Sequence, residues 1–274
     1  PAATSGRSEP IDRPPHYAHH LSNQPYTFRH LYHDDRGWVR FGMFIQAPGS
    51  YGPFWTYRRL IDAAQFSDPS YAEDLAMINW PGNDYRGRNL ITDSPEAMLQ
   101  GLDEAKQLSL GFCYWLQVEA PRDEGGYGHP ELVLDRRVMG TSDGLSKYPY
   151  IRESRRIKAL CTIVEQDVAA EFHKGRARAR HFRDSVGIGS YSIDIHPNDL
   201  EKKLPPAPTK PFQIPLGALI PADTDNLLAG CKNIGTTHIT NGCYRLHPIE
   251  WNIGAAAGAV AADGIRGRRT PAQL

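Results

Sequence analysis

The spacing of hydrophobic positions predicts one long helix in the middle of the chain. Apolar residues recur at helical intervals from Met98 to Leu116. Ser94 is a favourable N-cap and Pro95 suits the first helical position. We therefore expect the helix to begin just after Ser94 and to end before Pro121, with its apolar face packed against a sheet.

Shorter runs of β-branched and aromatic residues predict strands on both sides of this helix. A hairpin is expected between residues 26 and 46, with its turn at 33–37. Buried strands of the C-terminal half are expected at 157–164, 186–195, 212–220 and 226–229. The predicted fold class is therefore α+β, with a mixed or antiparallel sheet and a long helix.

A second helix is predicted near the C-terminus, over residues 248–262. It has Pro248 in its first turn, Gly264 just past its end and small residues along one face. Small residues let a helix lie close to a sheet or to a flat ligand. The start of a helix also presents unpaired N–H groups and a partial positive charge, which favour a negatively charged group.

Composition is that of an ordinary globular protein. The chain has 274 residues, 40% of them hydrophobic, and 31 basic residues balance 31 acidic ones. This neutrality argues against nucleic-acid binding, and the basic cluster at 266–269 is interpreted as a solvated tail. No apolar run is long enough to span a membrane and the sequence shows no signal peptide; the absent signal does not settle the compartment, and the cytoplasm is the favoured expectation. The four cysteines form no Cys-x-x-Cys pair, so no metal site is predicted.

Domain organisation follows from these patterns. Residues 1–25, rich in Pro, Ser, Arg and His, are expected to form an extended N-terminal arm. Residues 26–210 are expected to form a substrate-binding domain, and 211–274 the C-terminal part of a second domain.

An Arg-Glu-Ser-Arg-Arg run at residues 152–156 concentrates positive charge around one carboxylate. Three arginines cannot all pair with Glu153, so one or two should face an anion such as a cofactor phosphate or a substrate carboxylate. Arg152 and Arg156 are the preferred candidates. The equally weighted alternative is an ion-pair network that joins two domains.

Three segments of the chain carry a resemblance to a known family. They are Tyr-Ile-Arg-Glu-Ser-Arg-Arg at 150–156, Tyr-Ser-Ile-Asp-Ile-His at 191–196, and the strand–loop–Arg-x-x-Pro–helix series of 225–262. Together they resemble the C-terminal half of FAD-dependent oxidoreductases in the glutathione-reductase-like superfamily. The likeness extends from Trp80 to Ala262 and is closest to the family known simply as FAD-dependent oxidoreductase.

This resemblance implies that the C-terminal strand and helix belong to a Rossmann-like FAD domain and that FAD is the cofactor. The implied cofactor contacts are Gly230 and Asn233 at the strand end, and Arg245, Asn252, Ile253 and Gly254 at the helix start. Gly permits close approach of the backbone, and helix N–H groups can meet the flavin carbonyl.

Two histidines are candidate catalytic bases. His196 ends a predicted strand just before Pro197, where it could take a proton as hydride leaves a substrate for the flavin. The alternative is a histidine that caps the strand. His238 lies between strand end and helix start, so the resemblance places it near the flavin ring as a base or hydrogen-bond partner.

The Gly-x-Gly-x-x-Gly turn that cradles the FAD pyrophosphate is not found in this sequence. The nearest approach, Gly187-Ile188-Gly189, has Ser192 in place of the third glycine. We therefore expect the chain to be a fragment, the substrate-side half of an enzyme. Its activity should need a second polypeptide or a missing segment that carries the dinucleotide-binding half, and a homo-oligomer is compatible with the sequence.

The predicted reaction is abstraction of hydride from a C–H bond of a polar small molecule, such as a sugar, a polyol or a hydroxy acid. One alternative is a non-catalytic binding or assembly subunit that partners a flavoprotein half. Another is a hydrolase or lyase that uses His196 with Asp194 or Glu165, which would leave the flavin-like segment unexplained.

Overall fold

The computed structural model describes residues 8–32, 35–91, 94–195 and 206–273. The chain divides between Tyr150 and Ile151 into two compact units, here called the N-terminal and the C-terminal unit. Each unit has its own hydrophobic core and is described by itself.

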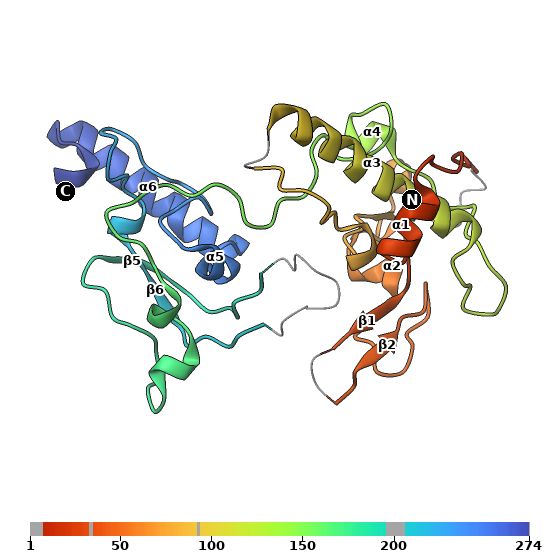
Figure 1. Cartoon of the computed structure of the whole chain (residues 1–274), viewed down its shortest axis with the longest axis horizontal. Helices are drawn as coiled ribbons and strands as arrows, with labels where there is room; N and C mark the ends of the chain where they lie inside the picture. Colours follow the sequence, from red (N-terminus) through yellow and green to blue (C-terminus); the bar gives the residue numbers. More distant parts are fainter. Residues whose placement is uncertain (1–7, 33–34, 92–93, 196–205, 274) are drawn as a thin grey trace. The chain divides into compact units, whose positions relative to one another are not determined.

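The long helix predicted in the N-terminal unit is present as α3, Pro95–Val118 (Figure 1). The hydroxyl of Ser94 accepts a hydrogen bond from the backbone N–H of Ala97 at 3.2 Å, which satisfies one N–H of the first turn. Pro95 occupies the start, where its missing N–H costs nothing. The predicted start and end of this helix are confirmed.

The predicted hairpin is also present. Strand β1 (Arg29–Leu31) pairs antiparallel with β2 (Trp38–Arg40). A second antiparallel pair joins β3 (Arg59–Ile61) to β4 (Leu75–Ala76). Two four-residue helices, α2 (Phe54–Tyr57) and α4 (Arg136–Met139), also lie in this unit.

Aromatic side chains make up most of the core of the N-terminal unit. The ring of Phe112 on α3 packs edge-on against Tyr26 with ring centroids 5.6 Å apart, and the ring of Trp115 packs against Phe28 at 4.9 Å. The predicted N-terminal arm contributes to this core, because α1 (Tyr17–Asn23) buries the ring of Tyr17. The expectation of an entirely extended arm was therefore wrong: an aromatic residue supplies the apolar surface that docks it.

The C-terminal unit is built around two strands and two helices. Strand β5 (Ser185–Gly189) pairs antiparallel with β6 (Phe212–Pro215), and α6 (His247–Gly267) packs against β5 (Figure 1). The short helix α5 (His238–Tyr244) precedes α6. Small antiparallel sheets combined with helices confirm an α+β class.

Two predicted strands of this unit are irregular. Residues 157–164 and 226–229 form no strand in the described parts of the chain. Their backbone groups instead form isolated hydrogen bonds with loop residues. For example, the N–H of Ile157 donates to the carbonyl oxygen of Asn233 at 3.0 Å. Only Ile163 and Ala229 of these runs are buried, whereas Leu160 and Leu227 are 56% and 48% exposed, so the expectation of buried strands here was wrong.

The units divide at a different place from the predicted boundary at residues 210 and 211. Because β6 pairs with β5 along its whole length, residues on both sides of that boundary share one core. The sequence pattern indicated that the Pro-rich stretch before β6 is a connection between domains. The pairing of β5 with β6 across this stretch is a non-local contact, which a local pattern does not reveal.

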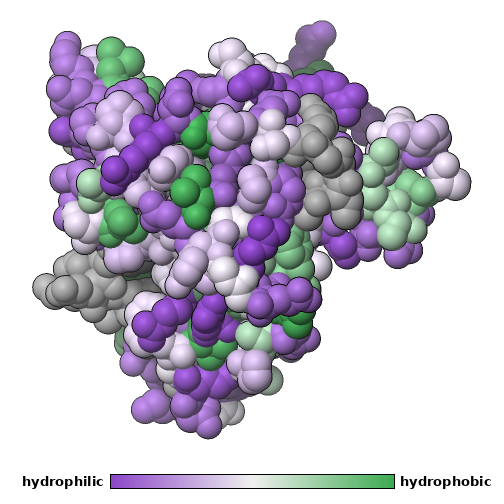
Figure 2. Space-filling model, turned by 90° about the vertical axis from the view of Figure 1, so that its right-hand side faces the viewer, coloured by the Kyte–Doolittle hydropathy of each residue, from purple (hydrophilic) through white to green (hydrophobic). Residues whose placement is uncertain are grey.

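The surface is mainly polar. Hydrophilic residues predominate on the face shown in Figure 2, where hydrophobic residues occur in small groups. Among the described residues, no helix has both the length and the apolar character needed to cross a bilayer.

Buried thiols should make the protein lose stability in alkali. Burial raises the pKa of Cys113 and of Cys243 from 9.0 to about 12. Between these values the unfolded chain loses protons that the folded chain keeps, so stability is intact below pH 9 and falls as pH rises toward 12. Each thiol should cost about 1.4 kcal/mol per pH unit in that window.

This loss can be measured as the free energy of unfolding in urea under reducing conditions. Cys113→Ala and Cys243→Ala should each flatten the fall above pH 9 and leave the slope below it unchanged. If both variants kept the wild-type slope above pH 9, the alkaline loss of stability could not be assigned to the thiols.

Candidate functional site

The arginine-rich segment of the C-terminal unit is held by a lysine. The ammonium group of Lys232 donates to the carbonyl oxygens of Ile151 and Arg152, at 2.8 and 3.3 Å. The guanidinium of Arg156 donates to the carbonyl oxygen of Ser154 at 2.7 Å. Of the two predicted anion-binding arginines, Arg156 therefore differs from Arg152 in its partner, because its guanidinium is hydrogen-bonded to the backbone of its own segment.

Arg152 and Arg245 meet at one carboxylate. Arg152 Nη1 lies 3.4 Å from Asp194 Oδ1, and Arg245 Nη2 lies 3.1 Å from Asp194 Oδ2. Arg245 also donates to the carbonyl oxygen of Asp194 at 2.9 Å. These contacts join three segments distant in sequence, but all three residues lie in the C-terminal unit, so this ion-pair network is internal to one unit and does not join two domains. Asp194 is thereby committed to arginines, which weakens the idea of a hydrolase that pairs it with a histidine.

His238 begins α5 and faces a buried carboxylate. Its Nε2 lies 3.6 Å from Glu153 Oε2; the His238 side chain is 47% exposed and that of Glu153 only 6%. A capping box fixes the backbone here, since Thr237 and Thr240 each accept a hydrogen bond from the other's backbone N–H at 3.0–3.1 Å. A half-exposed imidazole beside a buried acid has the arrangement of a proton acceptor with an orienting partner.

The predicted cofactor glycines come together. A methyl group added to Gly254 would lie 3.3 Å from the carbonyl oxygen of Gly230, tighter than most such contacts. The chain at Gly230 therefore runs against α6 where the helix has no side chain. Gly230 itself is exposed, and Asn233 is half-buried with its carbonyl bonded to Ile157.

The other predicted cofactor contacts lie on different faces of α6. The helix begins at His247, and the N–H groups of Ile249 and Glu250 in its first turn donate to the carbonyl oxygen of Leu246 at 2.9 Å. Asn252, Ile253 and Gly254 therefore lie inside the helix rather than at its first turn. Ile253 is buried in the core, and the Asn252 amide donates to the carbonyl oxygen of Pro248 at 2.8 Å.

His196, the other candidate base, falls outside the described residues. The structure therefore tests neither its position nor its partners. Of the histidines proposed as bases, His238 is the one whose surroundings are known.

The sequence analysis missed Glu153 and Lys232 as parts of this site. Glu153 was noted only as the acid among arginines, and its partner lies 85 positions later, so no local pattern joins them. It also missed a basic run at 174–183, whose lysine and arginines are all exposed. One of them, Arg178, lines a cavity of about 590 Å³ between β5, β6 and the start of α6.

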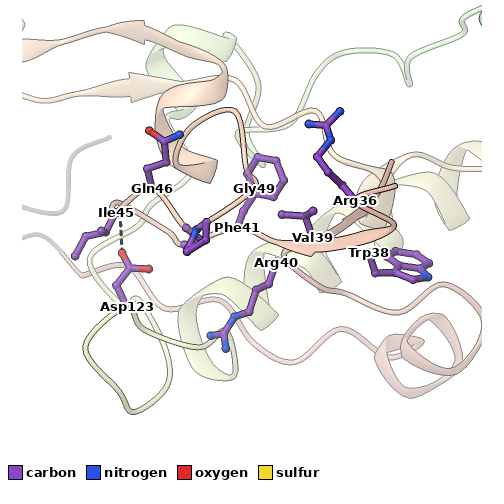
Figure 3. Close-up of a pocket in the computed structure, with 12 residues that line it drawn as sticks. Arg36, Trp38, Val39, Arg40, Phe41, Ile45, Gln46, Gly49 and Asp123 are labelled. Atoms are coloured by element: carbon purple, nitrogen blue, oxygen red, sulfur yellow. Dashed lines mark hydrogen bonds between the residues drawn. The ribbon is translucent and has the colours of Figure 1, made fainter. Parts of the chain in front are cut away.

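The N-terminal unit has a hollow of its own, with a volume of about 700 Å³ (Figure 3). One wall is β2 and another is the loop that follows it. The carboxylate of Asp123 holds this loop by accepting backbone N–H groups from Met43, Phe44 and Ile45 at 2.7–3.0 Å. The polar and aromatic lining includes Arg36, Trp38, Arg40, Phe41, Gln46 and Asp123.

Comparison with known proteins agrees with the resemblance read from the sequence. A family model described as FAD dependent oxidoreductase matches residues 9–274, nearly the whole chain. Comparisons with curated proteins and with solved structures gave no match. The family match indicates that FAD is the cofactor and that the general function is that of an oxidoreductase. The chain therefore belongs to the FAD dependent oxidoreductase family.

Proposed function

We propose that this chain is the substrate-side half of its enzyme and that it acts on a polar small molecule such as a sugar, a polyol or a hydroxy acid. The observation that carries the proposal is His238, a half-exposed imidazole held beside the buried Glu153. It lies in the same unit as the Gly230–Gly254 contact. An alcohol that loses hydride must also lose the proton on its oxygen, and His238 is placed to take that proton.

The residues present fit a flavin. Gly254 lets the segment of Gly230 lie against α6, and we propose that the flat ring approaches the exposed backbone of Gly230, which carries no side chain. The start of α6, a helix of 21 residues, adds a partial positive charge. Arg245 and Asn233 are the polar side chains proposed to line this place. When bound, FAD accepts the hydride from the substrate C–H bond.

The exposed face of α6 supports the proposal that a segment with a dinucleotide-binding sheet packs on it. Trp251 and Ile265 on this face are 80% and 79% exposed. The positions between them on the same face are small: Ala255, Gly258, Ala259 and Ala262. Small residues allow a helix to pack closely on a sheet, so we propose that a Rossmann-like FAD-binding half covers this face.

A charge placed on this face should separate folding from cofactor binding. We expect Ala259→Glu to leave the unfolding of the chain nearly unchanged, because Ala259 is exposed. It should weaken FAD retention in the complete enzyme by roughly 10-fold or more, because a carboxylate would be buried unpaired. Flavin content after purification measures the effect. Ala222→Glu, an exposed loop position, is the matched control, and equal flavin content in both variants would refute the packing.

The hollow of the N-terminal unit, taken by itself, supports the proposal that the substrate is polar. Its arginines and Gln46 offer hydrogen-bond donors, and the exposed Trp38 offers an apolar face. This combination suits molecules that carry hydroxyl groups on a compact carbon frame.

The visible absorption spectrum of the purified protein is the first test. The complete enzyme should show flavin bands, and these should bleach without oxygen when a polyol, sugar or hydroxy acid substrate is added. Bands that no member of these classes bleaches would favour a non-catalytic assembly role. A sample that stays colourless with added FAD and with the dinucleotide-binding half would overturn the proposed function.

A further inference from the structure

The contact between His238 and Glu153 joins one particular ring nitrogen to the carboxylate at ion-pair distance. The ring atom that faces the Glu153 carboxylate is Nε2, at 3.6 Å from Oε2. A neutral imidazole carries one N–H, and a neighbouring carboxylate favours the tautomer whose N–H points toward it. A carboxylate on the Nε2 side of the ring thus favours the N–H on Nε2, with the lone pair on Nδ1.

The backbone beneath His238 is anchored on several sides. The hydroxyl of Thr240, fully buried, donates to the carbonyl oxygen of Ile163 at 2.8 Å. The amide of Asn241, also fully buried, donates to the carbonyl oxygen of Lys232 at 2.8 Å. α5 is thus tied to two neighbouring segments, which fixes the backbone of His238 beside Glu153.

The Glu153 side chain is presented from a segment that is itself fixed. Lys232 binds the carbonyl groups of the two residues before it. Neighbouring Arg152 pairs with Asp194 on another segment of the same unit. The Glu153 side chain is 6% exposed, so its carboxylate meets His238 from inside the unit rather than from solvent.

We propose that Glu153 is a positioning residue that holds His238 in its Nε2–H tautomer, so that Nδ1 is the atom that accepts the substrate proton. This inference rests on the proposed function. As the substrate alcohol becomes a carbonyl, its O–H proton moves to Nδ1 and its carbon-bound hydrogen leaves with the electron pair to FAD. The imidazolium formed is compensated by the Glu153 carboxylate and later returns its proton to solvent.

The tautomer can be observed directly by ¹⁵N NMR of the complete, FAD-loaded enzyme with labelled histidine. The chain has 11 histidines, so the His238 signals are assigned by their loss in His238→Gln. Wild-type enzyme should show a protonated Nε2 and an unprotonated Nδ1. Glu153→Ala should give a mixture of tautomers and lower kcat by roughly 10- to 100-fold.

Two further variants make the test independent of folding. Glu153→Gln keeps the shape and an oxygen acceptor, so it should retain the Nε2–H tautomer and recover part of the lost kcat even if Glu153→Ala folds poorly. Glu171→Ala, an exposed glutamate of the same unit, should change neither measurement.

The outcomes separate the two proposals. An Nδ1–H tautomer in the wild type, or a tautomer that Glu153→Ala and Glu153→Gln both leave unaltered, would overturn the positioning role and leave the proposed function standing. A correct tautomer in an enzyme that oxidises no alcohol would overturn the proposed function, and with it the role of Nδ1 as base.

Discussion

His238→Gln should lower kcat by roughly 10²- to 10⁴-fold in the complete enzyme, the usual contribution of a positioned general base. Glutamine fills a similar volume but accepts no proton at neutral pH. Because the His238 side chain is 47% exposed, its loss should scarcely alter folding. Steady-state oxidation of the substrate measures the effect, and the flavin spectrum shows that FAD is still bound.

The control for this variant is His181→Gln. His181 is an exposed histidine of the same unit, so its replacement should leave turnover unchanged. If His238→Gln also turned over at the wild-type rate, His238 could not be the base, and His196 would be the remaining candidate among the histidines considered.

Local signals predicted the local structure well. The N-cap Ser94 and the following Pro95 fix the start of α3, because both act within one turn of the helix. The β1–β2 hairpin also follows from adjacent segments. The predicted strand at 157–164 is absent because an apolar run does not by itself supply a ladder partner, which only a distant segment can provide.

The candidate site was less accessible to sequence reasoning than the family or the cofactor. The motifs around Gly230 and Arg245 were sufficient for both, and the family match confirms them. The side-chain contacts within the site could not be predicted in the same way. Asp194 binds Arg152 across 42 positions and Arg245 across 51, and neither pairing leaves a trace in local composition. An ion pair of this kind depends on the packing of α5 against the rest of its unit.

Tyr244→Ala should destabilise that packing by about 3–5 kcal/mol, the usual cost of removing a large aromatic side chain from a core. Tyr244 ends α5 and has no exposed surface. Its ring lies 4.5 Å from that of Phe212 on β6, and its hydroxyl donates to the carbonyl oxygen of Gln213 at 2.6 Å. The residue therefore joins the helix that carries the candidate base to the sheet of the C-terminal unit.

Hydrogen exchange resolves where this loss falls. In Tyr244→Ala, amides of α5 and β6 should exchange faster, while those of α3 should not, because α3 belongs to a unit with its own core. Tyr244→Phe should cost only about 1–3 kcal/mol, since it keeps the ring and leaves one carbonyl without its donor. Tyr148→Ala, at a half-exposed position, should stay within about 0.5 kcal/mol of wild type. Equal exchange in Tyr244→Ala and wild type would mean that α5 is held by its cap and by Asn241 rather than by this ring.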